Sequence, residues 1–146
     1  MVKRADMQDA EILAALAVQM WTDHDPAALT EVFRNLIGSA DAVCFLKYVG
    51  TRPVAFAQCQ LRHDYVEGTD SSTVGYLEGI FVSEKYRRNG YAKELFSECE
   101  KWAKEMGCTE FASDCELDNT DSQRFHMAMG FLEANRIVCY KKDLQN

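Results

Sequence analysis

One continuous stretch, residues 75–92, constrains the fold of this chain more than any other. It begins with an apolar segment typical of a strand, continues through a basic turn that contains Gly90, and enters a helix-forming segment. The first N–H groups of a helix lack partners within the helix, and the helix dipole adds positive potential there. Gly90 and Ala92 leave room for a ligand to approach the backbone. We therefore predict an anion site, with Arg87 and Arg88 adding charge-assisted hydrogen bonds to a diphosphate.

Composition and charge fit one globular domain spanning residues 1–146. Hydrophobic residues make up 47% of the sequence and charged residues 27%, and no apolar run approaches the ~20 residues of a membrane span. The first residues lack the apolar segment of a secretory signal, so we expect a cytoplasmic protein and no membrane partner. The formal charge of −7 disfavours nucleic acid as a partner. It suits an anionic cofactor at the basic turn and a cationic substrate elsewhere.

The cysteines show neither Cys-x-x-Cys spacing nor a zinc-like cluster with histidine, so no metal is implied. Because most of them fall in apolar or helical segments, we expect reduced thiols buried in the core. Disulfides and a catalytic nucleophile are the disfavoured alternatives. The residues concerned are Cys44, Cys59, Cys99, Cys108, Cys115 and Cys139.

Hydrophobic periodicity predicts a mixture of helices and strands. Helices are expected over residues 8–21, 26–38, 91–106 and 121–129, and strands over residues 2–5, 42–49, 53–65, 75–82, 109–113 and 131–141. The strand–helix–strand unit within residues 75–113 makes its two strands parallel. The predicted fold class is therefore α+β, with a mixed, mostly antiparallel sheet that is flanked by helices and closed by residues 131–141.

The basic turn also carries a resemblance. It lacks the three glycines of the Rossmann fingerprint and the Gly-Lys-Ser/Thr of a P-loop, but Arg87-x-x-Gly90-x-Ala92 resembles the acetyl-CoA pyrophosphate loop of the GNAT superfamily of N-acyltransferases. Gly130-Phe131, after a short helix, resembles the usual end of that fold. The resemblance implies a GNAT fold with one splayed parallel strand pair. The alternative is a basic loop before an ordinary helix.

A narrower resemblance covers essentially the whole chain. Residues 62–72 (Arg-His-Asp-Tyr-Val-Glu-Gly and onward), residues 76–82 (with Leu-Glu-Gly-Ile) and Ala112-Ser113-Asp114 are similar to bacterial aminoglycoside 6′-N-acetyltransferases, and Trp21 fits as well. This resemblance implies acetyl transfer from acetyl-CoA to the 6′-amino group by direct attack, without a covalent enzyme intermediate, and hence antibiotic resistance. It also implies a homodimer, for which the apolar residues 131–140 are a candidate interface.

The resemblance assigns the cofactor site residue by residue. Gly79 can mark a bulge in its strand, and the Ile80 N–H then becomes the candidate oxyanion donor. The alternative is that Gly79 only relieves local crowding. The cofactor would be held by Ile80, Phe81, Val82, Arg87, Arg88, Asn89, Gly90, Tyr91, Ala92 and Asn119.

A polycationic substrate calls for carboxylates and an aromatic wall. We predict that Glu78 and Asp114, brought together by the two parallel strands, bind substrate ammonium groups, and that one of them accepts the proton of the reacting amine directly or through water. Tyr65 and Trp21 would line the sugar pocket. Each residue has a structural alternative: Glu78 as a solvated charge at a strand end, Asp114 as the cap of the turn before the last helix, and the aromatic residues as ordinary packing.

Two positions near the C-terminus depart from the patterns of these families. His126 stands where the superfamily often has tyrosine, so it either protonates the departing thiolate or is structural. In Glu133-Ala134-Asn135-Arg136, Asn135 replaces an acid that the resistance enzymes often carry, and Glu133 either compensates for it in substrate binding or faces water.

Two other functions stay open. One is acetyl transfer to polyamines or amino-sugars, which would use the same cofactor loop and an acidic pocket. The other is a catalytically silent module that senses acyl-CoA, and such a module would not require the acidic pair Glu78 and Asp114 beside the thioester.

Overall fold

The computed structural model describes residues 1–145 and divides into two compact units, one from Met1 to Asp114 and one that begins at Cys115. The second unit contains the helix α4 (Thr120–Ala128). The first unit contains, in chain order, β1 (Val2–Arg4), the 3-10 turn η1 (Met7–Asp9), α1 (Ala10–Ala17), α2 (Pro26–Ile37), β2 (Ala42–Val49), β3 (Arg52–Arg62), β4 (Val74–Val82), the 3-10 turn η2 (Glu84–Tyr86), α3 (Tyr91–Glu105) and β5 (Phe111–Ser113).

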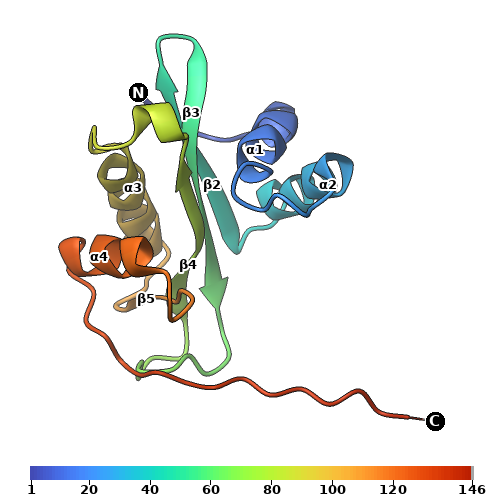
Figure 1. The fold of residues 1–146 in the computed structure, drawn as a ribbon. Helices are drawn as coiled ribbons and strands as arrows, with labels where there is room; N and C mark the ends of the chain where they lie inside the picture. The colour runs from blue at the N-terminus through green and yellow to red at the C-terminus, as the bar shows by residue number, and fades with distance from the viewer. Residues whose placement is uncertain (146) are drawn as a thin grey trace. The chain divides into compact units, whose positions relative to one another are not determined.

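The five strands of the first unit form one sheet in the order β1-β2-β3-β4-β5. Neighbouring strands are antiparallel except β4 and β5, which are parallel. Helices α1 and α2 cover one face of the sheet, and α3 covers the other (Figure 1). The predicted fold class, a mixed and mostly antiparallel sheet with one parallel pair, is confirmed.

The core between the sheet and the α1–α2 layer is built from large side chains that recur at helical spacing. Phe33 of α2 is fully buried and meets Phe56 of β3 edge-on, with 5.8 Å between ring centroids. The start of α2 is fixed by Asp25, whose carboxylate accepts the Ala28 N–H at 3.1 Å, and by Pro26 in the first turn. Burying one such apolar side chain stabilises the fold by about 1.5–3 kcal/mol.

The opposite core packs α3 against the sheet. Leu95, Cys99 and Trp102 are buried on one face of α3. The helix packs closely on β4 at Gly75, where an added Cβ would lie 2.9 Å from the Cβ of Ala103. This contact holds the helix that follows the basic turn firmly against the strand that precedes the turn.

Strand β4 contains a bulge at Glu78. Gln58 of β3 pairs with Gly79 and Cys59 pairs with Leu77, so Glu78 is an extra residue with no residue opposite. In a regular strand, residues 75 and 79 would point to the same face. Here an added Cβ at position 75 would meet α3, whereas one at position 79 would meet Trp21, after α1. The bulge therefore reverses which face of the sheet the second half of β4 presents.

Several elements differ from the sequence predictions. The strand predicted over residues 53–65 ends at Arg62, and the strand predicted over residues 109–113 begins at Phe111. The helix predicted to reach residue 21 begins as the turn η1, which Asp6 caps, and ends at Ala17. The strand predicted over residues 131–141 is wrong, because the residues after α4 form no helix or strand within the described part of the chain. Val138 and Tyr140 are 74% and 90% exposed. The segment has strand-forming residues, but a strand also needs a hydrogen-bonded neighbour, and no strand of residues 1–145 supplies one.

Burial of the thiols follows the prediction for most of the cysteines. Burial raises the pKa of the Cys44 thiol to about 12, which keeps it protonated and unreactive. The buried cysteines are Cys44, Cys59, Cys99 and Cys108, whereas Cys115 and Cys139 of the second unit are exposed. Within residues 1–145, every helix is too short or too polar to span a membrane.

Candidate active site

The basic turn leads directly into α3 and leaves the N-terminus of this helix accessible. Arg88 has φ +66° and Gly90 has φ +78°, so two residues of the turn adopt the left-handed conformation. Gly90 is the N-cap of α3, where no side chain caps the helix, and an added Cβ there would meet nothing within 4 Å. The first N–H groups of α3, from Tyr91 onward, therefore face an open approach, as an anion site requires.

Two polar side chains of the turn also hold it in shape. The Asn89 amide donates to the carbonyls of Tyr86 and Arg87 at 2.9 and 3.2 Å. The Arg87 Nε donates to the Val82 carbonyl at 3.0 Å, and its guanidinium lies 5.8 Å from the Phe81 ring. Arg87 thus ties the turn to the end of β4 as well as carrying charge beside it.

The parallel strands separate immediately after the bulge. β5 pairs with β4 only from Gly75 to Leu77. Within residues 1–145, the β5 side of β4 from Glu78 to Val82 has no strand partner, so backbone groups on that edge can bind a ligand. Phe81 can offer only its backbone, because its side chain is buried against Phe56 with 6.3 Å between centroids.

The structure places Glu78 and Asp114 at the same point of the sheet. The last parallel pair is Leu77 with Ser113, and the two acids each follow a member of that pair. β4 continues to Val82, so Glu78 is not a strand-end charge, and only 19% of its side chain is exposed. The predicted juxtaposition of the two strand segments is therefore present.

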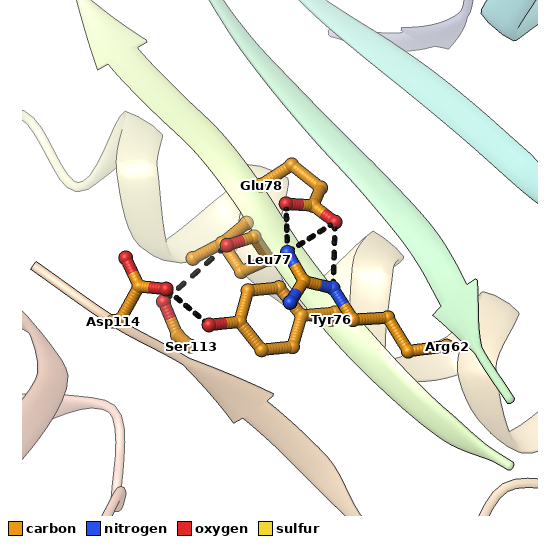
Figure 2. A network of polar contacts seen from close by, with 6 residues as sticks. All are labelled: Arg62, Tyr76, Leu77, Glu78, Ser113 and Asp114. Carbon is orange, nitrogen blue, oxygen red and sulfur yellow. Dashed lines mark hydrogen bonds and ion pairs between the residues drawn. The ribbon is translucent and has the colours of Figure 1, made fainter. Parts of the chain in front are cut away.

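Two residues connect these acids (Figure 2). Arg62, at the end of β3, donates from Nη2 to Oε1 of Glu78 at 2.7 Å and from Nε to Oε2 at 3.1 Å. Its guanidinium carbon lies 3.5 Å from the ring centroid of Tyr76. The Tyr76 hydroxyl in turn donates to Oδ2 of Asp114. Arg62, Tyr76, Glu78 and Asp114 thus form one contact chain, and we refer to these four residues as the acid network.

The electrostatics of the acid network fix its proton positions. The hydrogen bonds from Arg62 to Glu78 raise the pKa of the guanidinium, so Arg62 stays charged. Burial, and then the hydrogen bond to Asp114, raise the pKa of Tyr76 well above its ordinary value. The hydroxyl therefore stays protonated at neutral pH and can only be the donor in its bond to the carboxylate.

Sequence reasoning missed Arg62 and Tyr76 as members of the site. Tyr76 lies in an apolar strand, so its sequence context predicts a core residue. The context of Arg62 predicts a solvated residue at a strand end. The sequence did hold one indication of Arg62. Residues 53–65 partly alternate between apolar and polar side chains, which predicts a strand that carries this arginine beside the strand of Glu78.

The predicted aromatic residues lie in different surroundings. Trp21 is partly buried, and its indole would be 3.4 Å from a Cβ added at Gly79, so it lies beside the bulge. Tyr65 is 78% exposed on the loop after β3, and its hydroxyl donates to Glu67 at 3.3 Å. The structure thus brings Trp21 to the strand that carries Glu78. The Tyr65 side chain is exposed and contacts Glu67 of its own loop.

The same loop is anchored to the residue before β5. The Glu110 carboxylate accepts the N–H groups of Asp70 at 3.0 Å and Ser71 at 2.7 Å. The Ser71 hydroxyl, and then these N–H groups, lower the pKa of Glu110, which therefore stays ionised at neutral pH. The stretch that resembles the resistance enzymes is thus fixed at both ends, by β3 and by Glu110.

The remaining predicted residues lie in the second unit. Asn119 is the N-cap of α4 and accepts the Ser122 N–H at 3.1 Å. His126 Nδ1 lies 2.7 Å from the Ser122 carbonyl, which makes Nδ1 the protonated nitrogen. Glu133 forms an ion pair with Arg136, and the Asn135 side chain accepts the N–H of the same residue at 2.8 Å.

Comparison with known proteins decides the family. The model of the Acetyltransferase (GNAT) family matches residues 10–131. This chain belongs to that family. It is 39% identical over 145 residues to an aminoglycoside N(6′)-acetyltransferase type 1 of Serratia marcescens, covering 99% of both chains, and 44% identical over 131 residues to one of Acinetobacter baumannii, covering 89% of both.

Solved structures give the same result for this GNAT protein. The aminoglycoside 6′-N-acetyltransferase AAC(6′)-Ih of Acinetobacter baumannii is 40% identical with a TM-score of 0.91, covering 99% of both chains. AAC(6′)-Iy, solved with the bisubstrate analogue CoA-S-monomethyl-acetylneamine, is 34% identical with a TM-score of 0.94, covering 99% of this chain and 98% of that one. The GNAT fold is therefore confirmed, and acetyl-CoA is the acetyl donor.

The residues present fit such a donor. A pyrophosphate needs an open helix N-terminus and adjacent cations, which the turn from Arg87 to Tyr91 provides. An extended pantetheine arm needs an unpaired strand edge, which β4 provides after Leu77. Among residues 1–145, no group of three or more His, Cys, Asp or Glu side chains is arranged to hold a metal ion.

Gly90→Ala tests the turn. Gly90 has φ +78°, so alanine there costs about 1–2 kcal/mol of stability and alters the N–H groups that face the ligand. We expect the Kd for coenzyme A, measured by calorimetry, to rise about tenfold or more, because misplaced N–H groups would lose at least about 1.4 kcal/mol of hydrogen bonding to the charged pyrophosphate.

Gly50→Ala is the matched control, because Gly50 also has positive φ (+60°) and open space, but lies in the β2–β3 turn. It should lose comparable stability and keep its coenzyme A affinity. Equal Kd values for Gly90→Ala and wild type would contradict the assignment of the turn.

Proposed function

We propose that this chain transfers the acetyl group of acetyl-CoA to the 6′-amino group of aminoglycosides. The observation that carries the proposal is the acid network, which stands where the unpaired edge of β4 begins. Two carboxylates at that point suit a polycationic amine substrate. The relatives of Serratia marcescens and Acinetobacter baumannii described above are named aminoglycoside 6′-N-acetyltransferases, which supports the same substrate class.

The cofactor side of the proposal rests on backbone groups. The N–H groups of residues 88–92 bind the pyrophosphate, helped by the charge of Arg87 and Arg88. Acetyl-CoA supplies a thioester whose carbonyl must be polarised, and the Ile80 N–H donates to that oxygen as negative charge develops on it. Val82 and Phe81 offer backbone groups along the same edge. We also propose that residues 1–146 form one acetyltransferase domain, since the family match crosses the boundary between the two units.

The substrate side rests on the two acids. Glu78 and Asp114 bind ammonium groups of the aminoglycoside, and one of them takes the proton of the reacting amine, directly or through water. The amine attacks directly, without an acetyl-enzyme. Trp21, beside the bulge, and Tyr65, on the anchored loop, are proposed to line the sugar pocket. The product amide is uncharged, so the drug loses one of the cations it uses for recognition, which is the basis of resistance.

Residues of the second unit enter this proposal through the resemblance alone. Asn119 is assigned to the cofactor, and Glu133 and Asn135 to the substrate. His126 is assigned to protonate the departing thiolate. Since its Nδ1–H donates to Ser122, the proton would leave from Nε2 of the doubly protonated ring.

A thiol-release assay tests the function. Acetyl-CoA is combined with kanamycin, tobramycin, an aminoglycoside with a 6′-hydroxyl group, spermine or a lysine-containing peptide. We expect turnover with kanamycin and tobramycin, and none with the 6′-hydroxyl compound. Turnover with spermine alone would show a polyamine acetyltransferase, and acetyl-CoA binding without any turnover would show a silent module. Either result would overturn the proposal.

Glu78→Gln and Asp114→Asn test the acids, because each amide keeps the shape of the side chain and removes its charge. For the acid that accepts the proton, kcat should fall by about 10²-fold or more, and for the other the KM of tobramycin should rise. The Kd for coenzyme A should stay at the wild-type value in both. If both variants had wild-type kinetics with tobramycin, the acids would have no part in the reaction.

We also propose a homodimer. The exposed apolar residues of the tail, among them Val138 and Tyr140, make residues 131–140 the candidate interface, since burying them would recover hydrophobic free energy. Sedimentation equilibrium should give the mass of two chains for wild type and for Gln145→Asp, which adds a charge to the same tail outside the interface. Val138→Asp should shift the protein towards the monomer. A monomeric wild type would refute the proposal.

A further inference from the structure

Arg62 is held on two sides at once. The edge of its guanidinium makes two N–H···O contacts with Glu78, at 2.7 and 3.1 Å, and its face stacks on Tyr76 at 3.5 Å. A group that donates two parallel hydrogen bonds from its edge while its flat face stacks on a ring is specific to arginine, since an ammonium group has neither a planar edge nor a planar face. Moving Arg62 away from Glu78 would break both contacts together.

Tyr76 gives this arrangement a rigid support. It is only 6% exposed and packs in a buried cluster with Val66 and Val74, against which Ala112 also packs. The hydroxyl end of the same ring donates to Asp114. One buried side chain therefore carries the guanidinium on its face and a carboxylate at its tip (Figure 2).

The charges of the acid network do not cancel. Arg62 pairs with Glu78, whereas Asp114 receives a hydrogen bond from a neutral hydroxyl, so one negative charge remains uncompensated. The bulge affects the orientation of the Glu78 side chain, because Glu78 is the extra residue of β4 and has no cross-strand partner to fix its direction. Arg62 supplies that direction instead.

We propose that Arg62 and Tyr76 are positioning residues that hold the carboxylates of Glu78 and Asp114 as one unit for the ammonium groups of the substrate. In this arrangement Asp114 contributes net charge to the binding of the polycation, and Glu78 contributes an oriented carboxylate. This inference rests on the proposed function, which does not assign either residue. The competing idea is that the guanidinium occupies the place of a substrate ammonium group and must be displaced.

Steady-state kinetics of Arg62→Gln and Arg62→Lys with tobramycin test the inference. Loss of the fork misplaces Glu78, so we expect kcat/KM to fall by about 10²-fold in Arg62→Gln, mainly through kcat. Arg62→Lys should recover little of this loss, because a charge without the planar fork does not orient both oxygens. Arg52→Gln and Arg52→Lys, at the opposite end of the same strand, are the matched controls and should keep wild-type kinetics.

Two readouts separate positioning from a purely structural role. In Arg62→Ala, millimolar guanidinium ion should restore part of kcat, whereas Arg52→Ala should not respond. The double variant with Tyr76→Phe should lose less activity than the product of the two single losses, because residues that act as one unit are not additive. A loss that followed only the melting temperature, with no rescue by guanidinium, would overturn the inference.

A lower KM for tobramycin in Arg62→Gln would also overturn it and would show that the guanidinium competes with the substrate. If wild type acetylates spermine and not tobramycin, the proposed function fails, and the same variants are measured with spermine. Equal kinetics of Arg62→Gln and wild type with that amine would then refute the positioning role separately. If no amine is acetylated, calorimetric binding of tobramycin decides, with weaker binding by Arg62→Gln expected and equal or tighter binding contradicting the inference.

Discussion

The site depends on one irregularity, the extra residue Glu78 in β4. Because Glu78 has no residue opposite on β3, the strand reverses its faces between Leu77 and Gly79. Gly79 then meets Trp21 instead of α3, and the pairing of β4 with β5 ends at the same point. A strand without the bulge would continue its alternation and direct Gly79 towards the helix layer of α3. The added residue thus lies where the open edge of β4 begins, and it carries a carboxylate beside that edge.

In the proposed function, a single strand serves two ligands in different ways. Its edge after Leu77 offers backbone groups, which suits a cofactor arm that varies little. Its face carries Glu78 and the neighbouring Tyr76, which suits a substrate recognised by charge. The basic turn and α3 extend the edge, while β3 and β5 contribute Arg62 and Asp114 to the face. The close packing of α3 on Gly75 keeps the turn in register with both.

The parts of the fold and of the candidate site that depend on residues close together in the sequence could be predicted. The helix start at Tyr91 and the open turn at Gly90 follow from a short run of residues. The proximity of Glu78 to Asp114 follows from the parallel pairing of the two strands in a strand–helix–strand unit. Arg62 and Tyr76 could not be assigned in this way. Their partners lie 16 and 38 residues away in the sequence, and a strand pattern gives the face of a residue without its cross-strand register. The same limit explains the wrong strand prediction for residues 131–141. Their pattern is typical of a strand, but a pattern does not show which strand would pair with it.

The most direct test of this account is a crystal structure of the protein with coenzyme A and tobramycin bound together. The account predicts the pyrophosphate on the N–H groups of residues 88–92, the pantetheine arm along β4 beyond Leu77, and the 6′-nitrogen within hydrogen-bonding distance of Glu78 or Asp114, directly or through one water. A coenzyme A molecule bound away from the open edge of β4, or a drug whose ammonium groups contact neither acid, would contradict it.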